Sequence, residues 1–221
     1  MWTWTGMERF AVTGRFITFE GGEGCGKSTQ IRLLAERLRA DGKDVMLTRE
    51  PGGTGLAERI RALVREVSDD PPNARAETLL FLASRAQLVS EVIRPALEKG
   101  TWVLCDRFAD STFAYQGYGR GLDLSGLREL NAFATSGLVP DRTVLLDVSA
   151  GTSAERMRIR ERATGAAADR MEMAGAEFHA RLKRGFLELA AAEPERFAVI
   201  AADGGVDEVA EKVWNSIRHM I

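Results

Sequence analysis

Short apolar runs alternate along the chain with longer segments in which apolar residues recur at helical spacing. The apolar runs predict five buried strands, at 16–19, 45–48, 102–105, 144–148 and 197–201. The helical spacing predicts helices at 28–38, 54–67, 75–98, 124–136, 153–162, 174–192 and 206–219. Strands separated by helices imply right-handed crossovers and a parallel sheet. We therefore predict an α/β fold of three layers, a five-stranded parallel sheet flanked by helices.

The composition agrees with one such domain. A chain of 221 residues, 45% of them hydrophobic, is long enough to bury one large core. No run of 18 uninterrupted apolar residues is present, so no membrane-spanning segment is predicted. Residues 1–14 contain two Trp but lack the charged start and long apolar core of a signal peptide. We expect a poorly ordered extension at 1–14 and a single domain at 15–221.

The net charge and the cysteine content indicate which partners and which cellular location to expect. A net charge of −2 indicates no bulk attraction to nucleic acid. The two cysteines, Cys25 and Cys105, suit a reducing cytoplasm, where they are most simply free thiols. The expected location is therefore cytoplasmic, with no nucleic acid and no membrane as partners.

The strongest chemical signal follows the first predicted strand, where the residues form a complete G-x-x-x-x-G-K-S phosphate loop. Its glycines let successive N–H groups face one anion, Lys27 can reach the β and γ phosphates, and the Ser28 hydroxyl can ligate Mg²⁺. The predicted helix that follows adds positive potential at the phosphates. We predict a nucleoside triphosphate site there. Its expected contacts are Gly21, Gly22, Glu23, Gly24, Cys25, Gly26, Lys27, Ser28 and Thr29.

Two charged residues, Asp106 and Arg107, follow the third predicted strand. Asp106 follows this strand and would lie beside the phosphate loop, where a carboxylate can hold Mg²⁺ or its water shell. The alternative role of Asp106 is to cap a turn or a helix. Arg107 stands where a motor protein would usually carry a second acidic residue to activate water. Its guanidinium offers a planar fork for a second phosphate, which indicates transfer to an acceptor rather than hydrolysis.

The predicted helix at 75–98 carries a candidate nucleobase site. Phe81 and Arg85 are four residues apart and therefore project from one helix face. A ring can stack on a base, and a guanidinium can donate to a base carbonyl. Without context, Phe81 is more simply a core residue and Arg85 a solvated or paired charge.

The same spacing recurs after Asp106, where Ser111 and Tyr115, and Thr112 and Gln116, are four residues apart. If this segment is helical, hydroxyl and amide groups face the strand ends. Such groups suit the imide edge of a pyrimidine, although Gln116 could instead cap a turn before Gly117.

Four motifs together resemble bacterial thymidylate kinases. They are Phe-Glu-Gly-Gly-Glu-Gly-x-Gly-Lys-Ser-Thr at 19–29, Thr-Arg-Glu-Pro-Gly-Gly-Thr at 48–54, Phe-Leu-x-x-Arg at 81–85 and Asp-Arg-Phe-x-x-Ser-Thr-x-Ala-Tyr-Gln-Gly at 106–117. The resemblance implies a P-loop nucleoside monophosphate kinase fold and a homodimer. It also implies transfer of the γ-phosphoryl group of MgATP to dTMP, giving dTDP and ADP for dTTP synthesis.

The resemblance also implies roles for individual positions. Glu23 would contact the 3′-hydroxyl of dTMP, Arg107 its phosphate, and Tyr115 the face of the sugar where a ribose would carry its 2′-hydroxyl. Phe81 would stack on thymine, and Arg85 would donate to a base carbonyl. The residues expected at dTMP are Glu23, Pro51, Phe81, Arg85, Arg107, Ser111, Thr112, Tyr115 and Gln116.

At one position of the phosphate loop the chain differs from some thymidylate kinases and resembles others. Some thymidylate kinases place a catalytic arginine after the acidic residue of the phosphate loop, but here that residue is Gly24. The positive charge is expected instead from an arginine-rich lid at about 151–171, where arginines stand at 156, 158, 160 and 162. The catalytic group is expected to be Lys27, Arg107, Arg158 and Arg160. On a continuous helix these lid arginines cannot all face inward, so one or two must be solvated or paired with Glu.

Two other functions remain open from the residues. A kinase for dCMP, UMP or AMP would share the loop and the lid, and a regulatory ATPase that transfers nothing would share the loop alone. A GTPase would need an Asn-Lys-x-Asp motif, which the chain lacks.

Overall fold

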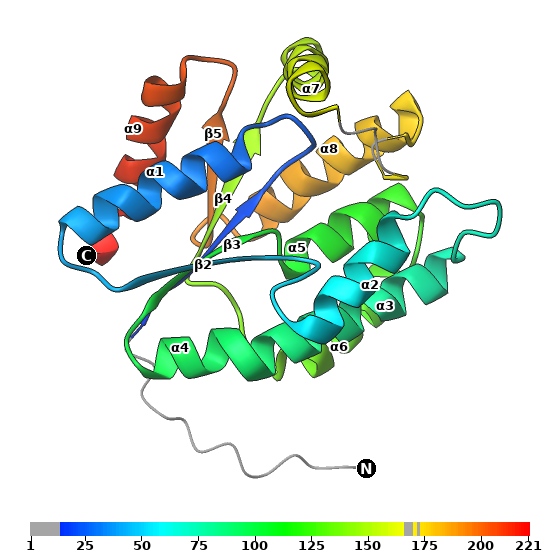
Figure 1. The fold of residues 1–221 in the computed structure, drawn as a ribbon, viewed down its shortest axis with the longest axis horizontal. Helices are drawn as coiled ribbons and strands as arrows, with labels where there is room; N and C mark the ends of the chain where they lie inside the picture. Colours follow the sequence, from blue (N-terminus) through cyan, green and yellow to red (C-terminus); the bar gives the residue numbers. More distant parts are fainter. Residues whose placement is uncertain (1–13, 166–169, 172) are drawn as a thin grey trace.

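The computed structural model describes residues 14–165, 170–171 and 173–221, and it contains a five-stranded sheet in which all paired strands are parallel (Figure 1). The strand order is β2-β3-β1-β4-β5. The strands are β1 (Phe16–Glu20), β2 (Val45–Arg49), β3 (Trp102–Asp106), β4 (Arg142–Asp147) and β5 (Phe197–Ala201). The predicted α/β architecture is confirmed.

Helices cover both faces of the sheet (Figure 1). On one face lie α1 (Lys27–Ala40) and α9 (Val206–Ile217). The other helices are α2 (Gly55–Arg65), α3 (Ala74–Leu88), α4 (Arg94–Glu98), α5 (Ala109–Thr112), α6 (Leu124–Thr135), α7 (Ala150–Thr164) and α8 (Ala176–Ala192). Of these, α7 lies against the loop after β1, where the Ser153 hydroxyl donates to the backbone oxygen of Glu23 at 2.7 Å. Among the described residues, no helix is long and apolar enough to cross a membrane.

The core is divided by the sheet because successive strand residues point to opposite faces. Ile17 and Phe19 of β1 pack with the apolar side chains of α1 and α9. Phe16 packs on the other face with the segment that ends in α4. A third cluster joins α8 to the segment after α5 around Tyr115 and Phe186. All five residues of β1 are buried, as expected of a central parallel strand.

Two predicted helical segments differ from regular α-helix. The helix predicted at 75–98 is interrupted between α3 and α4 by a π-helical turn, Val89–Ile93. Pro95, in the first turn of α4, has no N–H to donate, and the wider turn precedes it. After β3 the chain is helical, as α5 followed by a π-helical segment, Phe113–Gly119. The segment that carries Ser111, Thr112, Tyr115 and Gln116 is therefore helical, as their predicted arrangement on one side requires.

Other differences concern element ends. β4 begins at Arg142, two residues earlier than predicted, and α7 begins at Ala150 because the Ser149 hydroxyl accepts from the Thr152 N–H as its N-cap. Residues 1–13, 166–169 and 172 lie outside the described residues, so the predicted extension and the full extent of the predicted lid stay predictions.

The crossing of α8 over the π-helical segment gives a stability prediction. Gly185, inside α8, lies so close to Tyr118 that an added Cβ would be 2.6 Å from two atoms of that side chain. Alanine favours a helix interior over glycine by about 1 kcal/mol, whereas overpacking a core costs about 1–3 kcal/mol. Two contacts at 2.6 Å place the cost in the upper part of that range, at about 2–3 kcal/mol. We expect Gly185→Ala to lower the free energy of unfolding by about 1–2 kcal/mol in urea denaturation.

The control is Gly151→Ala in α7, because nothing lies within 4 Å of a Cβ added at Gly151. This variant should be as stable as the parent or slightly more stable. Equal stability of Gly185→Ala and the parent would contradict the close crossing.

Candidate active site

The phosphate loop between β1 and α1 has the backbone that its glycines permit. Gly21, Gly24 and Gly26 have φ angles of 133°, 67° and 98°, which side chains other than hydrogen disfavour. The Lys27 ammonium is buried and donates to the backbone oxygens of Gly21 at 3.2 Å and Gly22 at 2.9 Å. The loop is thereby closed around the N-terminus of α1, where no side chain caps the first N–H groups. These N–H groups can bind an anion.

Arg107 is held in a strained backbone conformation at the end of β3. Its φ of 70° is unusual for a residue other than glycine. The Arg107 N–H donates to the Phe19 oxygen at 2.9 Å, which extends the pairing of β3 with β1 by one residue. The guanidinium donates to the Gly21 oxygen at 3.0 Å and to the Glu23 carboxylate at 2.6 Å. Arg107 therefore connects the phosphate loop with the strand beside it.

Glu20 organises the turn that follows Arg107. Its carboxylate is fully buried and accepts from the Phe108 N–H at 2.8 Å, the Ser111 N–H at 3.2 Å and the Ser111 hydroxyl at 2.6 Å. Burial, and next the charge of Asp110, raise the pKa of Glu20 from 4.5 to about 7. The last residue of β1 thus supports the backbone on which Arg107 stands.

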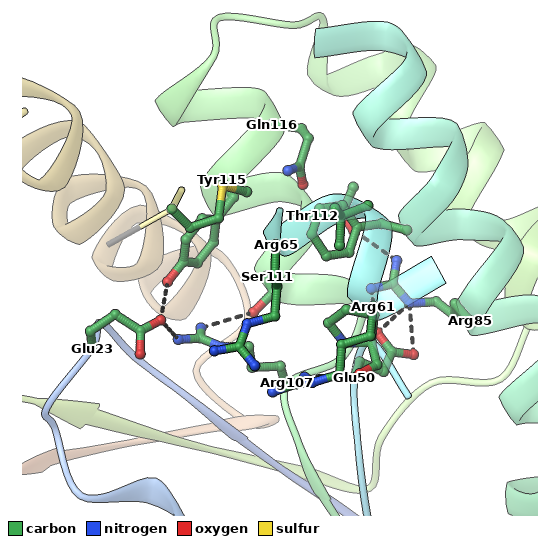
Figure 2. A pocket seen from close by; sticks show the side chains of 14 residues that line it. Glu23, Glu50, Arg61, Arg65, Arg85, Arg107, Ser111, Thr112, Tyr115 and Gln116 are labelled. Carbon is green, nitrogen blue, oxygen red and sulfur yellow. Dashed lines mark hydrogen bonds and ion pairs between the residues drawn. The ribbon is translucent and has the colours of Figure 1, made fainter. Parts of the chain in front are cut away.

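In contrast to Glu20, Glu23 inside the phosphate loop has a lowered pKa. Burial alone would raise its pKa, but the charges of Arg107, Lys27 and Arg160 lower it to about 2. The Tyr115 hydroxyl lies 3.4 Å from the same carboxylate oxygen that Arg107 contacts (Figure 2). Glu23 is therefore a carboxylate that can accept a hydrogen bond from a ligand hydroxyl.

A pocket opens beside the phosphate loop, and all nine residues predicted to bind the acceptor line it: Glu23, Pro51, Phe81, Arg85, Arg107, Ser111, Thr112, Tyr115 and Gln116. The pocket has two ends (Figure 2). Glu23 and Arg107 lie at the end toward the loop, whereas Gln116, Thr112 and Arg85 lie at the other. The structure thus brings together residues that are up to 93 positions apart in the sequence, from 23 to 116.

Arg85 is more completely engaged than the sequence suggested. Its side chain is buried, and all five N–H groups of its guanidinium have partners within the chain. These partners are the Glu50 carboxylate, the Thr112 hydroxyl, the Asn131 side-chain oxygen and the Phe108 backbone oxygen. A base carbonyl bound by Arg85 must therefore share or replace one of these hydrogen bonds.

Five further lining residues were not foreseen: Glu50, Arg61, Val64, Arg65 and Met171. Arg61 donates to the Pro51 oxygen at 2.9 Å, and its pKa is lowered by burial and by the neighbouring charges of Arg65 and Arg49. Such a concentration of positive charge at one wall favours an anionic ligand. The four-residue spacing of Arg61 and Arg65, after the turn at Pro51, was an available signal.

A second cavity also lies against the phosphate loop. This cavity is lined by residues 24–30 of the loop and α1, and by Arg156, Arg160 and Gly204. Arg156 and Arg160 share one face of α7, and Arg156 donates to the Gly204 oxygen at 3.4 Å. Arg158 is exposed and lies outside the residues that line this cavity.

The two residues predicted to hold a metal are neighbours. The Ser28 hydroxyl donates to the Asp106 carboxylate at 3.1 Å, so a hydroxyl and a carboxylate converge beside Lys27. Oxygen ligands of this kind suit Mg²⁺, which usually takes only one or two carboxylates and keeps several waters.

Known proteins of one family match most of this chain. A sequence profile described as thymidylate kinase matches residues 19–213. The chain is 54% identical to the thymidylate kinase of Desulfovibrio desulfuricans over 196 residues, which cover 88% of this chain and 90% of that one. It is 50% identical to the thymidylate kinase of Citrifermentans bemidjiense over 207 residues, covering 93% and 92% of the two chains.

A solved structure, the thymidylate kinase of Ehrlichia chaffeensis, superposes with a TM-score of 0.75 at 35% sequence identity. The match covers 92% of this chain and 98% of that one. The sequence profile and the relatives match most of the chain, and the solved structure shares its fold. The chain belongs to the thymidylate kinase family.

Proposed function

We propose that this chain is an ATP-dependent phosphotransferase that moves the γ-phosphoryl group of ATP to dTMP, giving dTDP and ADP. The observation that carries the proposal is the acceptor pocket. It is lined by Glu23 of the phosphate loop and by Arg107, which donates to Gly21 and Glu23 of that loop, so donor and acceptor phosphates would meet at one edge of the sheet. A regulatory ATPase would need no second pocket of this kind.

The phosphate loop is the proposed donor site. Lys27 and the N–H groups of residues 21–29 would hold the β and γ phosphates of ATP. Lys27 would exchange its present contacts with the loop oxygens of Gly21 and Gly22 for phosphate oxygens. Mg²⁺ bound at Ser28 and Asp106 would neutralise charge on the transferred phosphate.

Cations at the loop end of the pocket would hold the acceptor phosphate. Arg107 is the proposed ligand, assisted by Arg61, whose surroundings already carry excess positive charge. Glu23 would accept from the 3′-hydroxyl of the sugar. Tyr115 would pack beside the sugar and exclude a 2′-hydroxyl, and Ser111 would complete this end.

The other end of the pocket is the proposed thymine site. The half-buried Phe81 ring would stack on the base, while Thr112 and Gln116 would meet its polar edge. Arg85 would donate to a base carbonyl by sharing its bond with Thr112. Pro51 would form the wall behind the acceptor.

The lid would supply the charge that the phosphate loop lacks at Gly24. Arg160 is the proposed lid catalyst, because it lines the cavity at the loop. Arg156 lines the same cavity and is a better second candidate than Arg158, which lies on another side of α7. Transfer needs no covalent intermediate and no strong base, since the acceptor is already an oxyanion. Catalysis then depends on bringing two phosphates together and neutralising their charge.

We further propose that the chain acts as a homodimer in the cytoplasm. Large apolar side chains are exposed on the adjacent helices α3 and α6: Leu79 is 57%, Leu130 42% and Phe133 79% exposed. A cluster of this kind suits burial against a second copy. The cytoplasmic location rests on the two buried free thiols, Cys25 and Cys105.

The substrate assignment predicts the outcome of a coupled ADP assay with MgATP and each nucleoside monophosphate. We expect kcat/KM for dTMP to exceed the values for dCMP, UMP and AMP by at least tenfold, because a pocket built to pair with one set of polar groups leaves buried groups unpaired with another. ATP hydrolysis that no monophosphate accelerates would sink the assignment.

In the same assay, Arg107→Ala should lower kcat/KM for dTMP by about 100-fold or more, since a charge-assisted hydrogen bond to phosphate is lost. An exposed arginine, Arg32→Ala on α1, is the matched control and should leave the rate unchanged. Full activity of Arg107→Ala with unaltered KM for dTMP would remove Arg107 from the acceptor site.

Glu20 predicts a pH dependence of stability. Between its ordinary pKa of 4.5 and its folded value of about 7, the unfolded chain has lost a proton that the folded chain keeps. The free energy of unfolding attributable to Glu20 therefore falls as pH rises from about 4.5 to about 7, by up to about 1.4 kcal/mol per pH unit. Glu20→Gln should lack this component in urea denaturation across that range. Parallel pH profiles for the two proteins would contradict the raised pKa.

The dimer proposal is tested by sedimentation velocity. Phe133→Glu should convert the dimer to a monomer, because a buried unpaired charge at the interface is costly. Val199→Glu on β5 is the control, since Val199 is also exposed, at 49%, but lies away from α3 and α6. A wild-type monomer at micromolar concentration would refute the proposal.

A further inference from the structure

A buried carboxylate lies behind the thymine end of the pocket. Glu77, on α3, is one helical turn before Phe81 and two before Arg85, and its side chain is 1% exposed. It is not among the residues that line the pocket. An ionised group in such a position must be paired by neighbouring groups.

Two arginines pair with Glu77. The Arg120 guanidinium contacts one carboxylate oxygen at 3.2 Å, and the Arg170 guanidinium contacts the same oxygen at 2.7 Å. Arg170 also donates to the Val64 oxygen of α2 at 3.0 Å, which anchors it on a second element. Guanidinium groups are donors only, so Glu77 is held as a carboxylate that can only accept hydrogen bonds.

This pairing decides how the Gln116 amide is turned. The second oxygen of Glu77 lies 2.8 Å from the Gln116 Nε2. An amide oxygen in that place would face an acceptor without a proton between them, so the NH₂ group must face Glu77. The amide oxygen of Gln116 is then directed toward the interior of the pocket, as Figure 2 shows.

We propose that Glu77 is a positioning residue that sets the base specificity of the acceptor pocket by presenting Gln116 as a hydrogen-bond acceptor. The inference rests on the proposed function, because it assumes that the base lies between Phe81 and Gln116. An imide base such as thymine or uracil carries an N3–H that donates to this oxygen. Cytosine has an unprotonated N3 there, which would face the oxygen acceptor to acceptor.

The hydrogen bond between Glu77 and Gln116 also explains how the preference for an imide base over cytosine is maintained. A free glutamine amide can rotate by 180° and offer a donor, which would accommodate cytosine. The Glu77 carboxylate prevents this rotation without touching the base. Arg170 belongs to the lid predicted at about 151–171, so the same carboxylate also joins this residue to the base site.

The test compares dTMP and dCMP as acceptors for the wild type and for Glu77→Gln. The substituted side chain keeps its size but offers both a donor and an acceptor, so the Gln116 amide gains freedom to rotate. We expect the ratio of kcat/KM for dTMP to that for dCMP to fall by roughly 10- to 100-fold, the range that an unpaired buried polar group imposes. A parallel fall for both substrates, with the ratio kept, would overturn the proposal.

The matched control is Asp110→Asn. Asp110 is likewise a buried carboxylate paired with an arginine, Arg196 at 2.6 Å, but it has no contact with the amide of Gln116. Asp110→Asn should lower the free energy of unfolding. It should leave the ratio of kcat/KM for dTMP to that for dCMP within about twofold of the wild type, because it does not change the hydrogen bonds at the base.

A second variant covers the case in which Glu77→Gln does not fold. Gln116→Met keeps the pairs between Glu77 and its arginines and removes the amide, so the ratio should fall to a similar extent. Where both variants fold, adding Glu77→Gln to Gln116→Met should change the ratio no further. A retained ratio in Gln116→Met would refute the inference alone, whereas a wild type without preference for dTMP would refute the proposed function itself.

Discussion

The parallel pairing of β1 with β3 is the constraint on which the site depends. Its register sets Phe19 beside Asp106, and one more hydrogen bond, from the Arg107 N–H to Phe19, carries the pairing past the strand ends. The phosphate loop and the Asp106-Arg107 pair therefore leave the sheet side by side. Arg107 can therefore contact Gly21 and Glu23 of the phosphate loop while it lines the acceptor pocket.

Buried carboxylates position the groups that would meet the substrates. Glu20 supports the turn after Arg107, Glu50 holds Arg85, and Glu77 turns Gln116. In each case the acidic side chain comes from a different element than the group it orients. Arginines and amides have several possible orientations, and a buried acceptor selects one of them. The specificity of the pocket thus depends on residues behind its surface as much as on those that line it.

Much of this could be predicted from the chain alone, and the exceptions share a cause. The strands, the phosphate loop and the pairs Phe81 with Arg85 and Thr112 with Gln116 follow from local spacing, since the members of each pair lie four apart on helices. The resemblance to thymidylate kinases, and not spacing, implies the acceptor roles of Glu23 and Pro51. Arg61 lies outside the motif at 48–54, and only its spacing to Arg65 marks it in the sequence. Glu50 stands inside that motif without a partner that the sequence reveals, and Glu77 belongs to no motif. Their roles come from contacts with residues 35 and 39 positions away, which no local pattern reveals.

The sequence by itself determined the α/β architecture, the phosphate loop and the chemical class of each pocket residue, because apolar periodicity and short motifs depend on neighbours along the chain. Only the tertiary structure decided which face of α7 meets the loop, so that Arg156 and Arg160 line the cavity and Arg158 does not. It also decided that Arg85 is fully engaged and that the Gln116 amide is turned toward the base site. Orientation of a side chain is set by partners distant in sequence, and these become neighbours only when the sheet and its helices assemble.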